Sequence, residues 1–194
     1  MVQHLFIAPH NLVVEGTSDF TYMTVISDFL RGKEGYSALD QRWSIVPAGG
    51  AELIPSFVAL VGNKLEVTVV VDSRKGANQR LQKMASDGLL RPNRIIGIGS
   101  ILGTPAADIE DLFEPSEYLE LYNAAFGAKL DLASLSGTDP IVARIARNIG
   151  VDRFDHGVPA DHFLRNRDKV LPHLTEESLR RFSELFRRVN ATLP

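Results

Sequence analysis

The sequence predicts an α/β fold in which helices flank a mainly parallel sheet and a smaller helical segment follows. Over residues 1–100, short apolar runs typical of strands alternate with amphipathic runs typical of helices. This order favours parallel strands joined by helical crossovers. After residue 113 signals of helix starts replace the strand pattern. We therefore expect a core over residues 1–113 and a mostly helical segment over 114–194, of which about 151–168 rejoins the core.

Local signals place the individual elements. Strands are expected at residues 12–14, 44–46, 66–71 and 94–98, with a further short one at 151–154. Helices are expected at residues 18–30, 52–61, 77–86, 115–126, 139–148 and 176–191. In the first helix Met23, Ile26 and Leu30 recur at helical spacing and define a core face. Pro115 stands at a first helical position, which suits its fixed φ angle.

Composition excludes several classes of protein. Of the 194 residues, 44% are hydrophobic and 23% charged, which is typical of a globular chain with a substantial core. No apolar stretch approaches the roughly 18 residues of a membrane span, and the first residues lack the pattern of a signal peptide. We therefore expect a cytoplasmic protein with no membrane partner. Cysteine is absent, so any metal must be held by oxygen or imidazole ligands, and Mg²⁺ or Mn²⁺ fits that ligand set.

Charge is unevenly distributed along the chain. The formal net charge of −3 divides into −6 for residues 1–140 and +3 for residues 141–194. Electrostatic attraction to phosphates is screened beyond about 10 Å, so the local balance matters more than the total. The C-terminal part could therefore contact nucleic acid, or its arginines could form a solvated helix face.

The most informative residues are carboxylates that follow strand-like runs. Glu15 comes directly after the apolar residues 12–14, and Asp72 comes directly after 67–71. The carboxyl ends of parallel strands form the edge where α/β sheets bind ligands, so both side chains are expected to face one site. A buried, unpaired carboxylate costs several kcal/mol, and a divalent cation is its simplest partner. Asp19 lies in the first turn of the next helix, where it either joins this site or only interacts with the helix dipole.

Four motifs follow the expected strands in order, and together they carry a resemblance. They are Glu15-Gly16-x-x-Asp19, Pro47-Ala48-Gly49-Gly50, Asp72-Ser73-Arg74 and Ile109-Glu110-Asp111-Leu112-Phe113. In this order they resemble the TOPRIM domain of the OLD (overcoming lysogenization defect) family nucleases, over essentially the whole chain. The resemblance implies a TOPRIM, Rossmann-like fold. It also implies that the chain is the C-terminal catalytic region of a longer protein with an ATPase domain ahead of it.

The resemblance implies a two-metal site with Mg²⁺ or Mn²⁺. Cleavage of a phosphodiester by two metals needs several carboxylates that neutralise the cations. The implied metal ligands are Glu15, Asp19, Asp72, Ser73, Asp108, Glu110 and Asp111, and the implied catalytic residues among them are Glu15, Asp19, Asp72 and Glu110. Asp108 and Asp111 could instead form a polar start to the next helix. Family members commonly have Asp-x-Asp after the third strand, whereas this chain has Asp72-Ser73-Arg74. One expected carboxylate ligand is therefore missing, and Ser73 could offer a neutral oxygen instead.

Basic residues are the candidates for phosphate contacts. Arg74 follows Ser73 and would contact phosphate or form an exposed salt bridge. A cation near the metals would stabilise the charge that develops on phosphate, and Arg165, Arg167 and Lys169 are candidates by location. For Arg165, Arg167 and Lys169, solvated surface is the favoured alternative. Asp155-His156 and Asp161-His162 do not have the spacing of a metal site on one helix face.

Gly49-Gly50 could present backbone N–H groups to an anion or simply form a tight turn. The leading hypothesis is a metal-dependent DNA endonuclease that hydrolyses phosphodiester bonds. The alternative is a TOPRIM scaffold that binds metal and nucleic acid, or a protein partner, without cleaving. No pattern of base-reading side chains is visible, so contacts with the DNA backbone are expected to govern binding.

Overall fold

The computed structural model describes residues 9–61, 66–73 and 79–194, and it has the α/β fold that the sequence predicts. Within these residues four strands form one all-parallel sheet in the order β2-β1-β3-β4. The strands are β1 (His10–Val14), β2 (Trp43–Pro47), β3 (Glu66–Val71) and β4 (Ile95–Gly97). In the register, His10 of β1 lies beside Trp43 of β2 and Glu66 of β3, so the carboxyl ends of β1 and β3 lie side by side.

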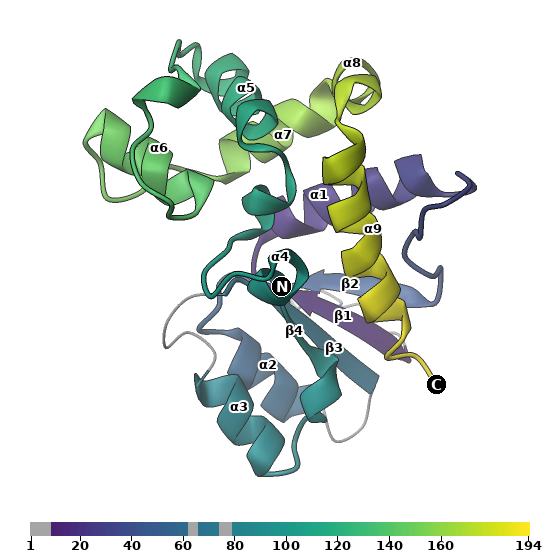
Figure 1. The fold of residues 1–194 in the computed structure, drawn as a ribbon. Coiled ribbons are helices and arrows are strands. Elements are labelled where there is room, and N and C mark those ends of the chain that lie inside the picture. The colour runs from purple at the N-terminus through teal and green to yellow at the C-terminus, as the bar shows by residue number, and fades with distance from the viewer. Residues whose placement is uncertain (1–8, 62–65, 74–78) are drawn as a thin grey trace, which may run out of the picture.

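Side-chain alternation along the strands explains why both faces of the sheet are covered. Leu12, Val14 and Val70 point to one face, and Val13 and Val69 point to the other, with all five fully buried. Helices α2 (Ile54–Val61) and α3 (Gln79–Ser86) cover the second face, whereas α1 (Thr17–Leu30) and α9 (Glu176–Asn190) cover the first (Figure 1). Parallel sheets require this double cover because their strands are apolar on both sides.

The remaining helices stand beyond the carboxyl ends of the strands. They are α4 (Ile98–Leu102), α5 (Pro115–Phe126), α6 (Ile141–Ile149), α7 (Gly157–Arg165) and α8 (Arg167–Val170). The 3-10 turn η2 (Ile109–Leu112) lies between α4 and α5, η3 (Leu132–Ser134) lies between α5 and α6, and η4 (Leu171–His173) follows α8. A further 3-10 turn, η1 (Pro92–Arg94), leads directly into β4. Helix α7 packs against α1 and α5, and α9 packs against α1 and α4. Figure 1 shows α5, α6 and α7 on the side of α1 away from α2 and α3.

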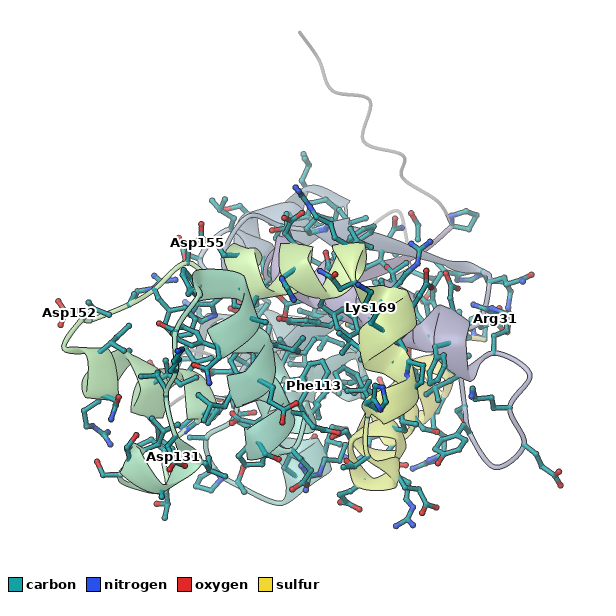
Figure 2. The ribbon with its side chains drawn as sticks, turned by 90° about the horizontal axis from the view of Figure 1, so that it is seen from above. Arg31, Phe113, Asp131, Asp152, Asp155 and Lys169 are labelled. Carbon is teal, nitrogen blue, oxygen red and sulfur yellow. The ribbon has the colours of Figure 1, made fainter. Side chains whose placement is uncertain are left out.

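Aromatic packing joins the sheet and the helices after residue 113. Phe113 is buried among the rings of Tyr22, Phe163 and Phe182, with ring centroids 5.0–5.9 Å apart and edge-to-face geometry. Figure 2 shows Phe113 inside the molecule, whereas Asp152 projects from its edge. One core cluster thus includes side chains from both sides of the expected boundary at residue 113. The boundary stays a prediction, but α7, within the segment expected to rejoin the core, packs on α1.

Two short elements differ from the expectation. The fourth strand ends at Gly97 rather than at residue 98, because Ile98 begins α4. Residues 151–154 form no strand: they follow the left-handed cap Gly150, and Phe154 packs on Tyr122 and Phe126 rather than on the sheet. A helix that is both long and apolar enough to cross a membrane is not found in the described part of the chain.

The chain after α4 returns to the end of β3. Ser73 and Ala107 pair through two antiparallel backbone hydrogen bonds, Ser73 N to Ala107 O at 2.7 Å and Ala107 N to Ser73 O at 2.9 Å. The Ser73 hydroxyl accepts a hydrogen bond from Gly99 N at 2.8 Å. A Cβ at position 99 would lie 2.3 Å from Thr104 O, so only glycine fits this close approach. Because η2 begins two residues after Ala107, this backbone pairing places η2 beside Asp72.

Candidate functional site

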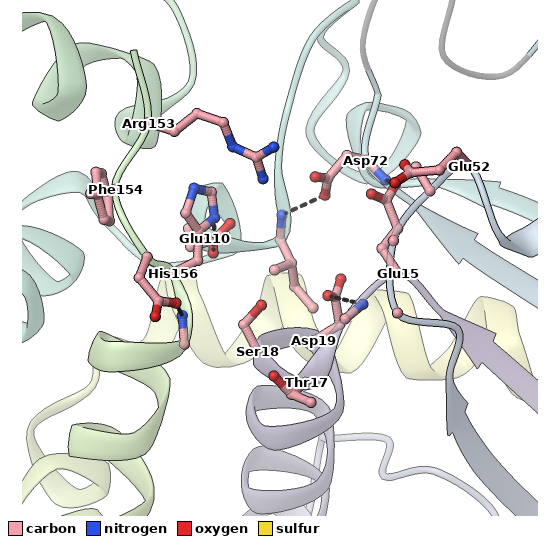
Figure 3. Close-up of a pocket in the computed structure, with 17 residues that line it drawn as sticks. Glu15, Thr17, Ser18, Asp19, Glu52, Asp72, Glu110, Arg153, Phe154 and His156 are labelled. Atoms are coloured by element: carbon pink, nitrogen blue, oxygen red, sulfur yellow. Dashed lines mark hydrogen bonds and ion pairs between the residues drawn. The ribbon is translucent and has the colours of Figure 1, made fainter. Parts of the chain in front are cut away.

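A cavity of about 710 Å³ opens at the carboxyl ends of β1 and β3, where the sequence predicts a site. Its lining comes from five parts of the chain: residues 15–19, 49–52, 72, 109–110 and 153–157. Figure 3 shows the side chains of these parts converging on one space. The cavity therefore combines the strand ends with a turn and a loop from the helical part of the chain.

Glu15, Asp19 and Asp72 form the side of the cavity that we call the strand-end wall. Glu15 and Asp72 each follow the last residue of a strand, β1 and β3 respectively, and these strands are neighbours. The backbone N–H of Asp72 donates to Glu15 Oε1 at 2.8 Å, which orients the Glu15 side chain. The Asp72 carboxylate in turn accepts from Ile109 N at 3.1 Å, so it also holds the start of η2.

Asp19 completes the strand-end wall from the first turn of α1. Its Oδ2 accepts a hydrogen bond from Gly16 N at 2.9 Å, which closes the start of the helix. The side chain is 5% exposed yet lines the cavity, together with Gly16, Thr17 and Ser18. Asp19 thus has both roles that the sequence left open, helix-end stabilisation and a place in the site.

Glu110, Arg153 and His156 form the opposite side, which we call the helical wall. Glu110 lies in η2 and is 1% exposed. His156 precedes α7, and its Nδ1 lies 3.2 Å from Glu110 Oε1. The His156 ring also packs against Phe154 with centroids 5.0 Å apart. In Figure 3 the Arg153 guanidinium extends into the space between His156 and Asp72.

Burial and neighbouring charges raise the pKa of two carboxylates of the cavity, Asp19 and Asp72. Burial, followed by the charges of Glu110 and Glu15, raises the pKa of Asp19 to about 7. Burial also holds the pKa of Asp72 far above its usual range, and the neighbouring charges of Glu15, Asp108, Glu110 and Asp19 raise it further. Like charges in a partly dry site disfavour the ionised forms, and a bound cation would reverse this.

His156 is the titratable base in direct contact with this cluster. Burial lowers its pKa, but the hydrogen bond to Glu110 and the charges of Glu110 and Asp108 outweigh burial and raise the pKa overall. Arg153 opposes that rise through its own positive charge, which shows that the two basic side chains are electrostatic neighbours. The helical wall therefore brings positive charge to a cavity that is otherwise acidic.

Three of the expected metal ligands do not line the cavity. The Ser73 hydroxyl accepts from Gly99 N rather than facing the carboxylates. Asp108 is 1% exposed and acts on Asp72 through its charge. Asp111 accepts from two backbone amides, Asp108 N and Ile141 N, each at 2.8 Å. A metal-binding role for these three stays a prediction that the arrangement of the cavity does not favour.

Three of the four basic residues expected near the site lie elsewhere. Arg165 pairs with Asp161 in an exposed contact at 2.9 Å, and Arg167 lies 3.8 Å from Asp168. Lys169 lines a second, smaller cavity between α5, α7 and α8. Arg74 falls outside the described residues. The guanidinium that lines the carboxylate cavity is that of Arg153, which sequence reasoning missed although the Asp155-His156 pair stands only two residues further along.

The glycines after β2 form a tight turn around Glu15. The backbone N–H groups of Gly49 and Gly50 both donate to Glu15 O, at 3.0 and 2.8 Å. Their φ angles of 88° and 136° are in the region that favours glycine. The two amides hold the β1 end rather than an anion, so the turn interpretation is the correct one. Glu52, which the sequence did not single out, lines the cavity from the start of the next helical segment.

The donor set of the cavity fits a hard divalent cation. Glu15, Asp19, Asp72 and Glu110 supply oxygen ligands of the kind that Mg²⁺ and Mn²⁺ prefer. Among the described residues, no three Asp, Glu or His side chains already stand in the arrangement of a metal site. Cation binding would therefore require these side chains to close together from their present hydrogen bonds.

Comparison of the chain with models of protein families, with curated proteins and with solved structures found no match.

Proposed function

We propose that this chain is a metal-dependent DNA endonuclease domain that hydrolyses phosphodiester bonds by a two-metal mechanism. The observation that carries the proposal is the convergence of Glu15, Asp19, Asp72 and Glu110 on one cavity, where burial and the neighbouring charges raise the pKa values of Asp19 and Asp72. A cluster of this kind is costly to ionise unless cations neutralise it. The order of the motifs, which resembles the TOPRIM domain of OLD family nucleases, supports the same activity.

The proposal gives each residue of the cavity a role. Glu15, Asp19, Asp72 and Glu110 would hold the cations, Mg²⁺ or Mn²⁺. When bound, two such ions would neutralise the carboxylates and supply the Lewis acidity that phosphodiester hydrolysis needs. Arg153 would donate to a non-bridging phosphate oxygen and stabilise the charge that develops there. His156 would hold Glu110 through the contact at 3.2 Å.

The shape of the site supports a polymer substrate. The cavity is open, and its lining includes polar backbone and side chains of Gly16, Thr17 and Ser18 at the start of α1. Helix starts favour anionic groups, so a phosphate adjacent to the scissile one could lie there. Within the proposal, the rest of the protein is an ATPase domain ahead of this chain, and the location is cytoplasmic, as the composition suggests.

A matched pair of substitutions on α1 tests the proposal. Asp19→Asn removes a cavity carboxylate, whereas Asp28→Asn removes an exposed carboxylate on the same helix, 3.5 Å from Arg31. We expect the wild type and Asp28→Asn to bind Mn²⁺ by calorimetry and to cut plasmid DNA with Mg²⁺ or Mn²⁺. In Asp19→Asn, both the affinity for Mn²⁺ and the rate of DNA cleavage should fall by about 100-fold or more, because a charged ligand is removed.

The outcomes separate the candidate functions. Metal binding without cleavage in the wild type would favour the alternative, a TOPRIM scaffold that binds metal and nucleic acid or a protein partner. Absence of metal binding in the wild type at millimolar Mn²⁺ would contradict both. Equal behaviour of the two variants would mean that the cations lie away from this cavity.

A further inference from the structure

Asp111 lies next to Glu110 in η2 but is not among the residues that line the cavity. Its Oδ2 accepts from Asp108 N and its Oδ1 accepts from Ile141 N, both at 2.8 Å. The first of these bonds closes η2 on itself. The second joins η2 to the first residue of α6, thirty residues further along the chain. Asp111 thus accepts hydrogen bonds from two backbone N–H groups, and only a substitution to proline at position 108 or 141 would remove one of these donors.

These bonds matter because η2 carries Glu110 between two anchors. On one side Asp72 accepts from Ile109 N at 3.1 Å. On the other side Asp111 accepts from Ile141 N. Leu112 and Ile109 in the same turn are buried at 0% and 2% exposure, so the turn cannot shift without moving the core. The position of the Glu110 carboxylate therefore depends on both anchors.

We propose that Asp111 is a positioning residue: by accepting hydrogen bonds from Asp108 N and Ile141 N, it couples α6 to η2 and holds Glu110 in the cavity. The inference rests on the proposed function for its effect on catalysis, but it assigns Asp111 a role other than that of a metal ligand. Groups that orient a ligand in this way alter metal affinity or activity by about 10–100-fold when removed.

The Ile141 amide offers a test that leaves every carboxylate in place. Ile141→Pro removes the N–H that Asp111 accepts. Proline is tolerated at this site, because Ile141 is the first residue of α6 and Pro140 before it has φ −46° and ψ 142°, the conformation that a following proline requires. Ile141→Ala is the matched control, since it removes more of the buried side chain and keeps the N–H. Ile141 itself does not line the cavity.

Ile141→Pro should lower kcat for DNA cleavage by about 10–100-fold at limiting Mg²⁺ and raise the Mg²⁺ concentration for half-maximal rate, with KM for DNA unchanged. Ile141→Ala should change these values by less than about threefold. Asp111→Asn should resemble Ile141→Pro, because its amide group cannot accept from both N–H groups. The double variant Asp111→Asn with Ile141→Pro should be no worse than either single one.

Several results would overturn the proposal. If Asp111 is itself a ligand, Asp111→Asn lowers the number of Mn²⁺ ions bound in calorimetry, whereas Ile141→Pro matches Ile141→Ala. If the hydrogen bond from Ile141 N to Asp111 does not position Glu110, the fold-reductions in kcat caused by Asp111→Asn and Ile141→Pro multiply in the double variant. Either result contradicts the coupling between α6 and Glu110.

One measurement is independent of metal and DNA. The amides of Asp111 and Phe113 donate to Asp108 O and Glu110 O within η2, at 3.0 and 3.2 Å. Their hydrogen exchange should accelerate at least tenfold in Ile141→Pro but not in Ile141→Ala. If the wild type neither binds Mn²⁺ nor cuts DNA, the proposed function fails while this exchange result still decides the positioning role. Equal exchange in the two variants would refute it.

Discussion

The two walls of the cavity differ in how the chain builds them. The strand-end wall consists of Glu15, Asp19 and Asp72, which follow neighbouring parallel strands or open the helix after one of them. The helical wall consists of Glu110, Arg153 and His156, which come from a 3-10 turn and from the loop before α7. Sheet geometry fixes the first wall, whereas the packing of α5, α6 and α7 fixes the second.

This difference has a chemical counterpart. The strand-end wall is purely acidic, and its carboxylates accept from the backbone amides of Asp72, Ile109 and Gly16. The helical wall pairs its one carboxylate with His156 and adds the Arg153 guanidinium. The proposed reaction needs both kinds of charge, cation ligands and a donor to phosphate. We therefore expect substitutions in the strand-end wall and in the helical wall to impair different steps of the proposed reaction.

The largest effect should come from the strand-end wall. Glu15→Ala or Asp72→Ala should each reduce metal-dependent cleavage of plasmid DNA by about 1000-fold or more, since losing a ligand forfeits several kcal/mol of charge stabilisation. The fold should stay intact, and without metal each variant should unfold at a higher denaturant concentration, because a carboxyl group that is costly to bury beside other carboxylates is gone. Cleavage assays and urea denaturation in EDTA check the two parts.

Glu52→Ala is the control for this prediction. Glu52 lines the same cavity but is exposed, and it follows the Gly49-Gly50 turn rather than the end of a strand. Its removal should leave cleavage within a few-fold of the wild type. A loss as large as that of Asp72→Ala would mean that the cations lie toward α2 and that the strand-end wall is wrongly assigned.

A smaller effect should come from the helical wall. Arg153→Gln should lower kcat by about 100-fold at saturating DNA, because a donor to the developing charge is lost, while the Mn²⁺ affinity measured by calorimetry stays unchanged. Arg165→Gln is the matched control, since Arg165 is exposed and paired with Asp161. It should have little effect on kcat. If the two variants have equal kcat values, Arg153 does not stabilise the charge that develops on phosphate.

The smallest effect concerns the pH dependence of stability without metal. The pKa of Asp19 is about 7 in the folded chain against 3.8 for an unperturbed aspartate, so the folded chain holds a proton that the unfolded chain releases. The stability linked to this proton is present below about pH 4 and is lost as pH rises toward 7. The contribution of Asp19 to the free energy of unfolding should therefore fall by about 1.4 kcal/mol per pH unit between pH 5 and 7.

Urea denaturation in EDTA at several pH values measures this slope. The raised pKa of Asp72 acts in the same direction, so it adds to the decline between pH 5 and 7 and extends the decline above pH 7. Asp19→Asn should make the slope between pH 5 and 7 less steep without abolishing it, and Mg²⁺ should stabilise the wild type most at high pH, where the cluster is ionised. Stability that increases from pH 5 to 7 in EDTA would contradict the predicted sign.

The sequence predicts the sheet and the strand-end wall well, for a local reason. The prediction of a strand at residues 66–71 is confirmed as β3, whose valine run is buried on both faces, and Pro115 correctly marks the start of α5. Glu15 and Asp72 are expected to meet because parallel strands end at one edge, and they do. These inferences need only the order of elements and the alternation along each strand.

The helical wall could not be predicted in the same way, because its residues meet only through tertiary packing. Arg153 enters the cavity because Phe154 packs on Tyr122 and Phe126, and this packing has no periodic signature in the sequence. Asp108, Glu110 and Asp111 form one acidic cluster in the sequence, but the 3-10 turn sends neighbouring side chains in different directions. A short acidic run in a sequence thus predicts that a site is nearby more reliably than it predicts which of its carboxylates line that site.

The close approach at Gly99 limits how this chain can vary. A methyl group there would lie 2.3 Å from Thr104 O and 2.8 Å from Ser73 Cβ. Any other residue would push apart the segments that pair Ser73 with Ala107 and would carry η2 away from Asp72. Among natural relatives of this chain, position 99 should therefore tolerate no substitution even though it does not line the cavity. Gly103 and Gly127, whose added Cβ would meet nothing within 4 Å, are free of that steric constraint.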